Sequence, residues 1–317
     1  MTIKNESKLR DPSYVRLAAN GELQKRAAVA RHLLESCELC PRKCRARRTE
    51  GQAGACRTLD KAVVYGAHPH FGEESPLVGR HGSGTIFFSH CNLACLFCQN
   101  YEISAQGKGN PIDSRTLAHL MLELQQMECH NINFVSPSHV VPQILEAVAY
   151  AAEKGLHIPL VYNSGGYDAV ETLQLLDGVI DIYMPDMKYG DAEMGQRLSG
   201  VPDYPNVNQA AVLEMHRQVG DLVLDQAGVA RRGLLVRHLV LPGGLAGTEA
   251  IARFLATEVS RNTYVNVMAQ YRPLFCADQY PPINRRITGQ EYREALGIME
   301  KHGLWRLDSR QQNVLSF

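Results

Sequence analysis

The chain has 317 residues, of which 45% are hydrophobic and 21% are charged, as is ordinary for a globular enzyme. Lys plus Arg and Asp plus Glu each number 33, so the net charge indicates neither a nucleic-acid nor a membrane partner. No run reaches the ~20 apolar residues of a membrane-spanning helix, and the first thirty residues lack the apolar core of a secretory signal. We therefore predict a cytoplasmic protein.

Seven of the nine cysteines fall into two tight groups, and the other two stand alone. The first group is Cys37, Cys40, Cys44 and Cys56, the second is Cys91, Cys95 and Cys98, and the isolated residues are Cys129 and Cys276. Thiols separated by two or three residues pair poorly as disulfides. In an intracellular protein such spacing more often indicates metal ligation.

The N-terminal part is predicted to contain little regular structure. Residues 1–20 are interpreted as a loose polar lead-in, and residues 22–34 show apolar positions at helical spacing. Together these form a lead-in segment, residues 1–36. A four-cysteine module follows at residues 37–60, with Gly51 and Gly54 in loops.

From Ser83 onward, short β-branched and aromatic runs alternate with helical stretches. The predicted strands are Thr85–Ser89, Ile132–Val135, Leu160–Asn163, Ile180–Pro185, Leu234–Leu241 and Tyr264–Met268. The predicted helices are Ser114–Cys129, Pro142–Lys154, Ala169–Leu176, Asn208–Val219 and Thr248–Ser260. This pattern predicts an α/β fold, an open partial (β/α)6 barrel over residues 61–280, with a C-terminal helical extension at 281–317.

The second cysteine group lies directly after the first barrel strand. The segment 84–100 leads from an apolar strand into C-x3-C-x2-C, with Phe97 just before the third cysteine. Three thiolates leave one iron of a four-iron cluster without a protein ligand. Another molecule can bind at that open position, just as catalytic zinc sites keep one position open. The alternatives are a zinc site completed by His90, or three unrelated buried thiols. We favour a [4Fe–4S] cluster.

This motif resembles the hallmark of the radical S-adenosylmethionine (SAM) superfamily. Further segments resemble the branch with pyruvate formate-lyase activating enzyme, often called PflX-like: Cys-Pro-Arg-Lys-Cys at 40–44, Cys-Gln-Asn at 98–100, Ser-Pro-Ser-His at 136–139, and Met-Pro-Asp-Met-Lys at 184–188. The resemblance implies that the open iron binds SAM and that reductive cleavage gives a 5′-deoxyadenosyl radical. That radical would abstract a hydrogen atom from an unknown substrate.

The resemblance also implies cofactor contacts at the strand ends. Ser136 and Ser138 stand where the superfamily usually carries an acidic Gly-Gly-Glu-Pro-like turn, which this chain lacks. Asn163 and Ser164 end the third strand, and Asp186 and Lys188 end the fourth, where they could instead simply pair with each other. Arg237 and His238 on the fifth strand must point to opposite faces, so at most one enters the barrel. We assign Arg237 to the cofactor carboxylate.

The first cysteine group predicts a second metal. Four thiolates at Cys37, Cys40, Cys44 and Cys56 suit structural zinc or a second iron–sulfur cluster equally well, and four unligated thiols are the alternative. The spacing does not decide between the metals, although a small folding module slightly favours zinc. Among the remaining residues, Cys129 is expected in a helix-packed core. His68, His70, Glu73 and Glu74 are expected in a loop before the first barrel strand, where they would either reach across the barrel mouth as acid–base groups or have a structural role.

Two classes of function remain open. As an enzyme, the protein would take electrons from a carrier such as flavodoxin or ferredoxin. It would activate a glycyl-radical enzyme or modify a peptide, an RNA or a small molecule. As a non-catalytic metal-binding adaptor, it would use both cysteine groups structurally.

Overall fold

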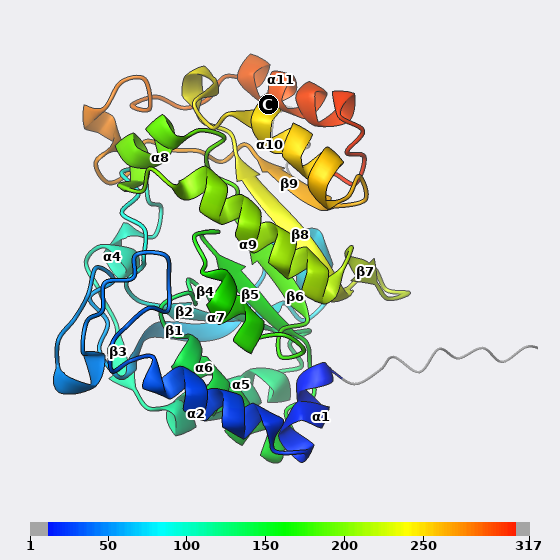
Figure 1. The fold of residues 1–317 in the computed structure, drawn as a ribbon. Coiled ribbons are helices and arrows are strands. Elements are labelled where there is room, and N and C mark those ends of the chain that lie inside the picture. The colour runs from blue at the N-terminus through cyan, green and yellow to red at the C-terminus, as the bar shows by residue number, and fades with distance from the viewer. Residues whose placement is uncertain (1–11, 309–317) are drawn as a thin grey trace, which may run out of the picture.

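A computed structural model describes residues 12–308. A central sheet with nine strands is covered by helices, which makes the fold mixed α/β (Figure 1). Residues 1–11 of the lead-in and 309–317 of the C-terminal extension lie outside the described range.

Six neighbouring strands of this sheet run parallel, in the order in which the chain forms them. They are β2 (Ser83–Phe88), β4 (Ile132–Val135), β5 (Leu160–Ser164), β6 (Ile182–Pro185), β8 (Ala230–Leu239) and β9 (Tyr264–Met268). Each corresponds to one predicted strand. Their carboxyl ends therefore meet at one edge of the sheet.

Alternating residues of these strands are buried on both faces. Phe134, Tyr183 and Val236 belong to the large core beneath the helices. Their neighbours in the strands, such as Ile182 and Leu235, pack on the opposite face. Burial on both faces explains why these strands are almost continuously apolar.

Three antiparallel strands complete the sheet, and they were not predicted. β1 (Ala62–His70) pairs with β2, β3 (Asn110–Ile112) pairs with β1, and β7 (Val223–Leu224) pairs with β8. The expectation that His68 and His70 lie in a loop is wrong, because both belong to β1. β1 lies between β3 and β2 but is only partly buried, so it lacks the apolar pattern that revealed the parallel strands.

The helices fill the connections between strands. Before β2 come α1 (Ser13–Ala19), α2 (Glu22–His32) and α3 (Ser75–Val78), and α4 (Tyr101–Ser104) follows it. The later helices are α5 (Ser114–Gln126), α6 (Val141–Glu153), α7 (Val170–Leu175), α8 (Ala192–Ser199), α9 (Tyr204–Val219), α10 (Thr248–Phe254) and α11 (Gly289–Lys301). The stretch predicted as one helix over 248–260 is α10 followed by a π-helical turn at Leu255–Val259.

The lead-in is more ordered than its polar sequence suggests. Residues 13–19 form α1, contrary to the expected loose segment, because Tyr14 is fully buried and its hydroxyl donates to the carbonyl of Ile158 at 2.9 Å. The predicted helix after Gly21 is present as α2, which packs against α6 (Figure 1).

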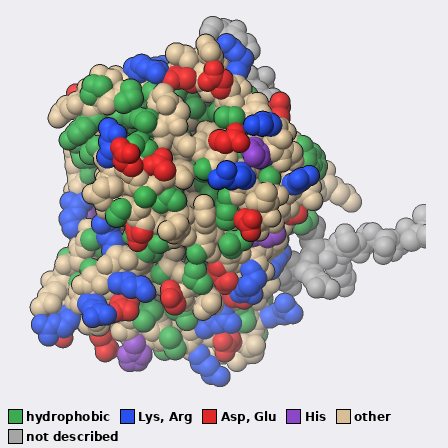
Figure 2. All heavy atoms as spheres, turned by 45° about the horizontal axis from the view of Figure 1, so that its top comes forward, with side chains coloured by type: hydrophobic (Ala, Val, Ile, Leu, Met, Phe, Trp, Pro, Cys, Tyr) green, Lys and Arg blue, Asp and Glu red, His purple; other side chains and the backbone are tan. Residues whose placement is uncertain are grey.

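The surface agrees with the balanced composition. Figure 2 shows acidic and basic side chains scattered among hydrophobic ones over one face. Within residues 12–308, every helix is too short or too polar to span a lipid bilayer.

One glycine fixes the backbone where β5 and β6 end. Gly166 has φ +73°, and a Cβ at this position would lie 2.1 Å from the carbonyl oxygen of Asp186. Gly200, at the end of α8, has a similar φ of +67° but open space around it. Gly166 therefore permits a close approach of two chain segments, whereas Gly200 meets only a conformational requirement.

We predict that Gly166→Ala and Gly200→Ala differ in their effect on stability. Gly200→Ala should lower the free energy of unfolding by ~1 kcal/mol, from left-handed strain alone. Gly166→Ala should lower it by about 3 kcal/mol, because overpacking adds to that strain. Urea denaturation measures both, and equal losses would contradict the close-packing argument.

Candidate functional site

The second cysteine group lies in a loop fixed at both ends. Cys91 follows β2 after two residues, and the amide nitrogens of Ala94 and Leu96 donate to the carbonyls of Ser199 and Leu198 at the end of α8. The amide of Leu93 also donates to Cys91 Sγ at 3.4 Å. The loop is therefore held by backbone hydrogen bonds and carries its thiols at the carboxyl edge of the sheet.

The three thiols lie close enough to influence one another. Burial raises the pKa of Cys91 to about 12, and the neighbouring Cys95 and Cys98 add to this rise. Burial also raises the pKa of Cys95, while the Lys188 ammonium opposes it. Cys95 accepts a hydrogen bond from Ser199 Oγ at 2.9 Å, and Cys98 lies 3.0 Å from Ser104 Oγ. The neighbouring hydroxyl, amide and ammonium groups thus stabilise the thiolate forms, whereas burial destabilises them. A bound metal cation would offset this effect of burial.

All three thiols line one pocket of about 210 Å³ with the ends of the parallel strands. Its polar lining includes Ser136, Asn163, Ser164, Asp186, Lys188, Arg237 and Gln270. Its apolar lining includes Phe88, Leu93, Phe97, Leu239 and Met268. The structure therefore brings the cysteine loop and most of the predicted cofactor residues around one space.

A buried carboxylate joins two of the strands at this pocket. Asp186 accepts a hydrogen bond from Lys188 Nζ at 2.6 Å and one from Arg237 Nε at 2.8 Å. Burial opposes ionisation of Asp186, but the two cations outweigh it and hold the pKa of this carboxyl below its ordinary value. The pocket therefore contains two cations and one carboxylate, an arrangement that suits a ligand with a negative group.

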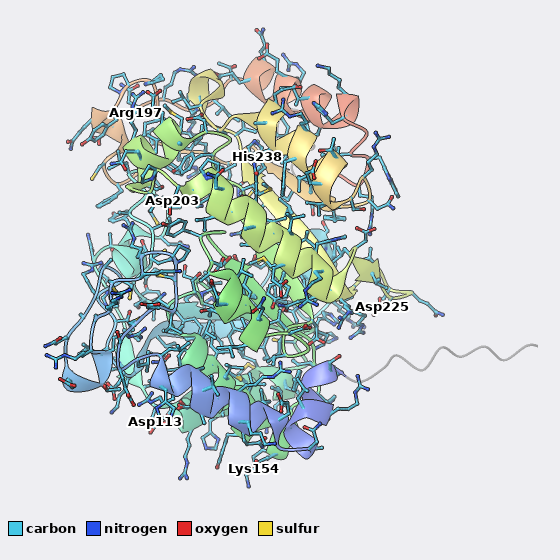
Figure 3. All side chains as sticks on the ribbon, viewed as in Figure 1. Asp113, Lys154, Arg197, Asp203, Asp225 and His238 are labelled. Atoms are coloured by element: carbon cyan, nitrogen blue, oxygen red, sulfur yellow. The ribbon has the colours of Figure 1, made fainter. Side chains whose placement is uncertain are left out.

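Arg237 and His238 point to opposite faces of β8, as strand alternation predicts. Arg237 lines the pocket, whereas the ring of His238 lies 2.8 Å from the carbonyl of Met187 and 2.9 Å from Thr248 Oγ1. Figure 3 labels His238 between α9 and α10, on the helix-covered side.

The predicted serine and asparagine residues divide into two groups. Ser136, with φ +60°, lines the pocket, and its amide donates to the carbonyl of Asn163 at 2.9 Å. Ser164 also lines it, but its hydroxyl donates to the buried Asp168 at 2.6 Å. Ser138 is outside the lining and forms hydrogen bonds with Tyr162 and Asp168.

Two contributors were missed by the sequence reasoning. Ser199 contacts Cys95, and Tyr189 lies 2.6 Å from Ser199 Oγ, yet neither belongs to a recognisable motif.

Glu73, which the sequence placed before the first barrel strand, lies 4.0 Å from Arg237 Nη1. Glu73 and Glu74 stand in the turn between β1 and α3, far from the pocket in sequence, so only the folded chain relates them to Arg237.

The first cysteine group lies beside this site. Cys37, Cys40 and Cys56 are buried and Cys44 is exposed. Burial raises the pKa of Cys40 to about 12, and the other three thiols contribute, so all four are near one another. Cys129 is buried in the main core, as expected.

Within residues 12–308, no three His, Cys, Asp or Glu side chains converge closely enough to hold a single metal ion. The ligands of an iron–sulfur cluster bind different iron atoms, so they need not converge on one point.

Comparison with known proteins places the chain in a family. No protein-family model matches it. The uncharacterized protein MJ0674 of Methanocaldococcus jannaschii is 35% identical over 291 residues, which cover 89% of this chain and 79% of that protein. The chain belongs to the MJ0674 family.

The chain is also similar to solved structures. A radical SAM methyltransferase from Sphaerobacter thermophilus has 14% sequence identity and a TM-score of 0.46. The match covers 69% of the present MJ0674-family chain and 64% of the methyltransferase chain, which is less than two thirds of the latter.

We predict that Glu73 gives this MJ0674-family protein part of its pH-dependent stability. Burial, with Glu74 adding to it, raises the pKa of Glu73 to about 7 although Arg237 opposes the rise. The folded state then binds more protons than the unfolded state, so the free energy of unfolding falls as pH rises from about 4.5 to about 7. Glu73→Gln should remove up to about 3 kcal/mol of that fall.

Denaturation of wild type and variant at a series of pH values measures this difference. Burial also raises the pKa of Asp181 to about 7, but its contribution is common to both proteins and cancels. Parallel stability curves would show that Glu73 is not the group responsible.

Proposed function

We propose that this protein is a radical SAM enzyme with a [4Fe–4S] cluster at Cys91, Cys95 and Cys98. The observation that carries the proposal is the shared pocket: three thiols face the Asp186, Lys188 and Arg237 network at the carboxyl edge of a parallel sheet. Three thiolates leave one iron of a cubane open to a cofactor.

The donor set suits such a cluster. Soft thiolates are the ordinary ligands of iron–sulfur clusters. The amide of Leu93 and the hydroxyl of Ser199 donate to two of the sulfurs, as second-layer groups around metal ligands commonly do. The Lys188 ammonium lies near Cys95 and offsets thiolate charge.

The remaining pocket residues suit SAM. Lys188 and Arg237 attract the carboxylate of its methionine part, and Asp186 fixes both cations in place. Ser136, Asn163 and Ser164 offer polar atoms at the ends of β4 and β5. Ser138, which bonds to Tyr162 and Asp168, remains a predicted cofactor residue whose role would be indirect.

Bound together, the cluster and SAM supply an electron and a carbon radical that removes a hydrogen atom from a substrate. The protein positions these groups and excludes water. Phe88, Leu93, Leu239 and Met268 provide the apolar part of the lining for that purpose. The six parallel strands are then interpreted as an open partial barrel, with residues 37–60 as a separate small module.

The finer assignment follows the sequence resemblance. We propose a PflX-like activity in the cytoplasm, fed by a carrier such as flavodoxin or ferredoxin. Its substrate would be a glycyl-radical enzyme or another peptide, RNA or small molecule.

Cys95→Ala should abolish SAM cleavage. After anaerobic reconstitution, wild type should be brown and form 5′-deoxyadenosine with dithionite, because its cluster is complete. The variant should form none, whereas the control Cys129→Ala should behave as wild type. A colourless wild-type protein with zinc and no cleavage would instead support a metal-binding adaptor.

Lys188→Met should weaken SAM binding by about tenfold, which corresponds to ~1.4 kcal/mol, because a charged hydrogen bond to the carboxylate is lost. Lys154→Met is the matched control, since Lys154 follows α6 at the edge of the molecule (Figure 3). Calorimetric titration of the reconstituted proteins measures both affinities. Equal affinities in proteins of equal iron content would exclude Lys188 from the cofactor site.

A further inference from the structure

We propose that Cys37, Cys40, Cys44 and Cys56 hold a second iron–sulfur cluster, which passes electrons to the first across a buried row of three tyrosines. The inference rests on the proposed function of the Cys91, Cys95 and Cys98 site, because it concerns how that site is reduced. It assigns a role to the four-cysteine module, which SAM binding leaves unexplained.

Backbone hydrogen bonds fold the four-cysteine module around its thiols. The amide of Cys37 donates to the carbonyl of Ala46 at 3.1 Å, and the amide of Arg45 donates to the carbonyl of Cys37 at 2.9 Å. The amide of Lys43 donates to the carbonyl of Cys40 at 3.0 Å. These bonds bring the segments that carry Cys37, Cys40 and Cys44 together.

A buried cation supports the same interpretation. The Arg48 side chain is 1% exposed, and its Nη1 lies 3.8 Å from Cys37 Sγ. Its other hydrogen bonds go to the neutral carbonyls of Leu59 and His139. A buried charge requires compensation, and a thiolate-bound cluster, which is negative, supplies it.

The module contacts the loop of the other cysteine group directly. Arg42 Nε donates to the carbonyl of Asn92 at 2.7 Å, and Asn92 Nδ2 donates to the carbonyl of Tyr167 at 2.6 Å. Asn92 lies between Cys91 and Cys95. The two groups are therefore joined by hydrogen bonds rather than separated by solvent.

Three tyrosine rings continue this connection through the interior. Tyr167 stacks on Tyr204 with ring centroids 6.2 Å apart and planes at 10°, and Tyr204 meets Tyr189 edge-on at 5.2 Å. All three residues are at most 3% exposed. Tyr167 also donates its hydroxyl to Asp203, labelled at the start of α9 in Figure 3.

Each end of the row reaches one cysteine group through hydrogen bonds. At one end, the carbonyl of Tyr167 accepts from Asn92 Nδ2, and the carbonyl of Asn92 accepts from Arg42 of the four-cysteine module. At the other end, the hydroxyl of Tyr189 lies 2.6 Å from Ser199 Oγ, which donates to Cys95 Sγ at 2.9 Å. The row thus extends from the four-cysteine module to Cys95.

The proposed electron transfer requires iron at the four-cysteine module, because zinc has no redox chemistry. One electron enters from an external low-potential carrier and reduces the second cluster. The same electron then reduces the first cluster and reoxidises the second, and no bond is made or broken.

The identity of the metal is tested with Cys44→Ala, which removes the one exposed cysteine of the module. Anaerobically reconstituted wild type should contain iron for two clusters, and the variant should lose about half of it. The variant should keep a first cluster whose electron paramagnetic resonance spectrum changes with SAM. Cys129→Ala should retain all the iron. One zinc ion per wild-type chain, with iron for one cluster only, would overturn the proposal.

The path is tested with Tyr167→Leu and Tyr167→Phe. Reduction by chemically reduced flavodoxin, followed anaerobically by stopped-flow absorbance, should be severalfold slower in Tyr167→Leu at unchanged iron content. Tyr167→Phe retains the ring and should react at the wild-type rate. Equal rates in all three proteins would remove the tyrosine row from the path.

The two proposals fail in different ways. If wild type forms no 5′-deoxyadenosine and its electron paramagnetic resonance spectrum does not change with SAM, the function proposed at Cys91, Cys95 and Cys98 is refuted. Retention of both, with zinc at Cys37, Cys40, Cys44 and Cys56, would refute only the second cluster.

Discussion

The candidate site depends on one buried carboxylate. Asp186 receives hydrogen bonds from Lys188, which follows β6, and from Arg237 on β8. Removing one partner of such a buried network typically costs 3–5 kcal/mol, because the remaining charge is left uncompensated. The same contacts set the charge of the pocket, hold two strand ends together and direct two cations toward the cysteine loop.

That network also gives the pocket fixed charges that suit a charged ligand. Asp186 is held ionised by its neighbours although burial opposes its charge. Glu73 is drawn into the same region through Arg237, and burial raises the pKa of this second carboxyl to about 7. The interior therefore combines a carboxylate that stays charged with one that is poised near neutrality, and Arg237 contacts both.

Much of the fold could be predicted because its strands are buried on both faces. Apolar runs such as Ile132–Val135 and Tyr264–Met268 have no other explanation, and both strands have the predicted bounds. Strand β1 escaped prediction because its residues are half-buried and include His68, Pro69 and His70. Helix α1 escaped it because the helix has only seven residues, and the burial of Tyr14 and Ala18 that anchors it comes from tertiary packing.

The site was predictable where local sequence determines position. The spacing of Cys91, Cys95 and Cys98 places them in one loop, and Asp186 and Lys188 pair with each other just after β6, as their two-residue spacing allows. Ser199 and Tyr189 could not be found in this way, because their relation to the pocket arises only from tertiary packing. For the same reason, the row of Tyr167, Tyr204 and Tyr189 has no counterpart in the sequence pattern.

The central claim is that three thiols hold an iron cluster with one iron open to SAM. The most direct test is the electron paramagnetic resonance spectrum of the dithionite-reduced, reconstituted protein, recorded with and without SAM. The account predicts a cluster signal whose g values shift when SAM is added, because the cofactor binds the open iron. A cluster signal that SAM leaves unchanged, or a protein that takes up no iron at these cysteines, would contradict it.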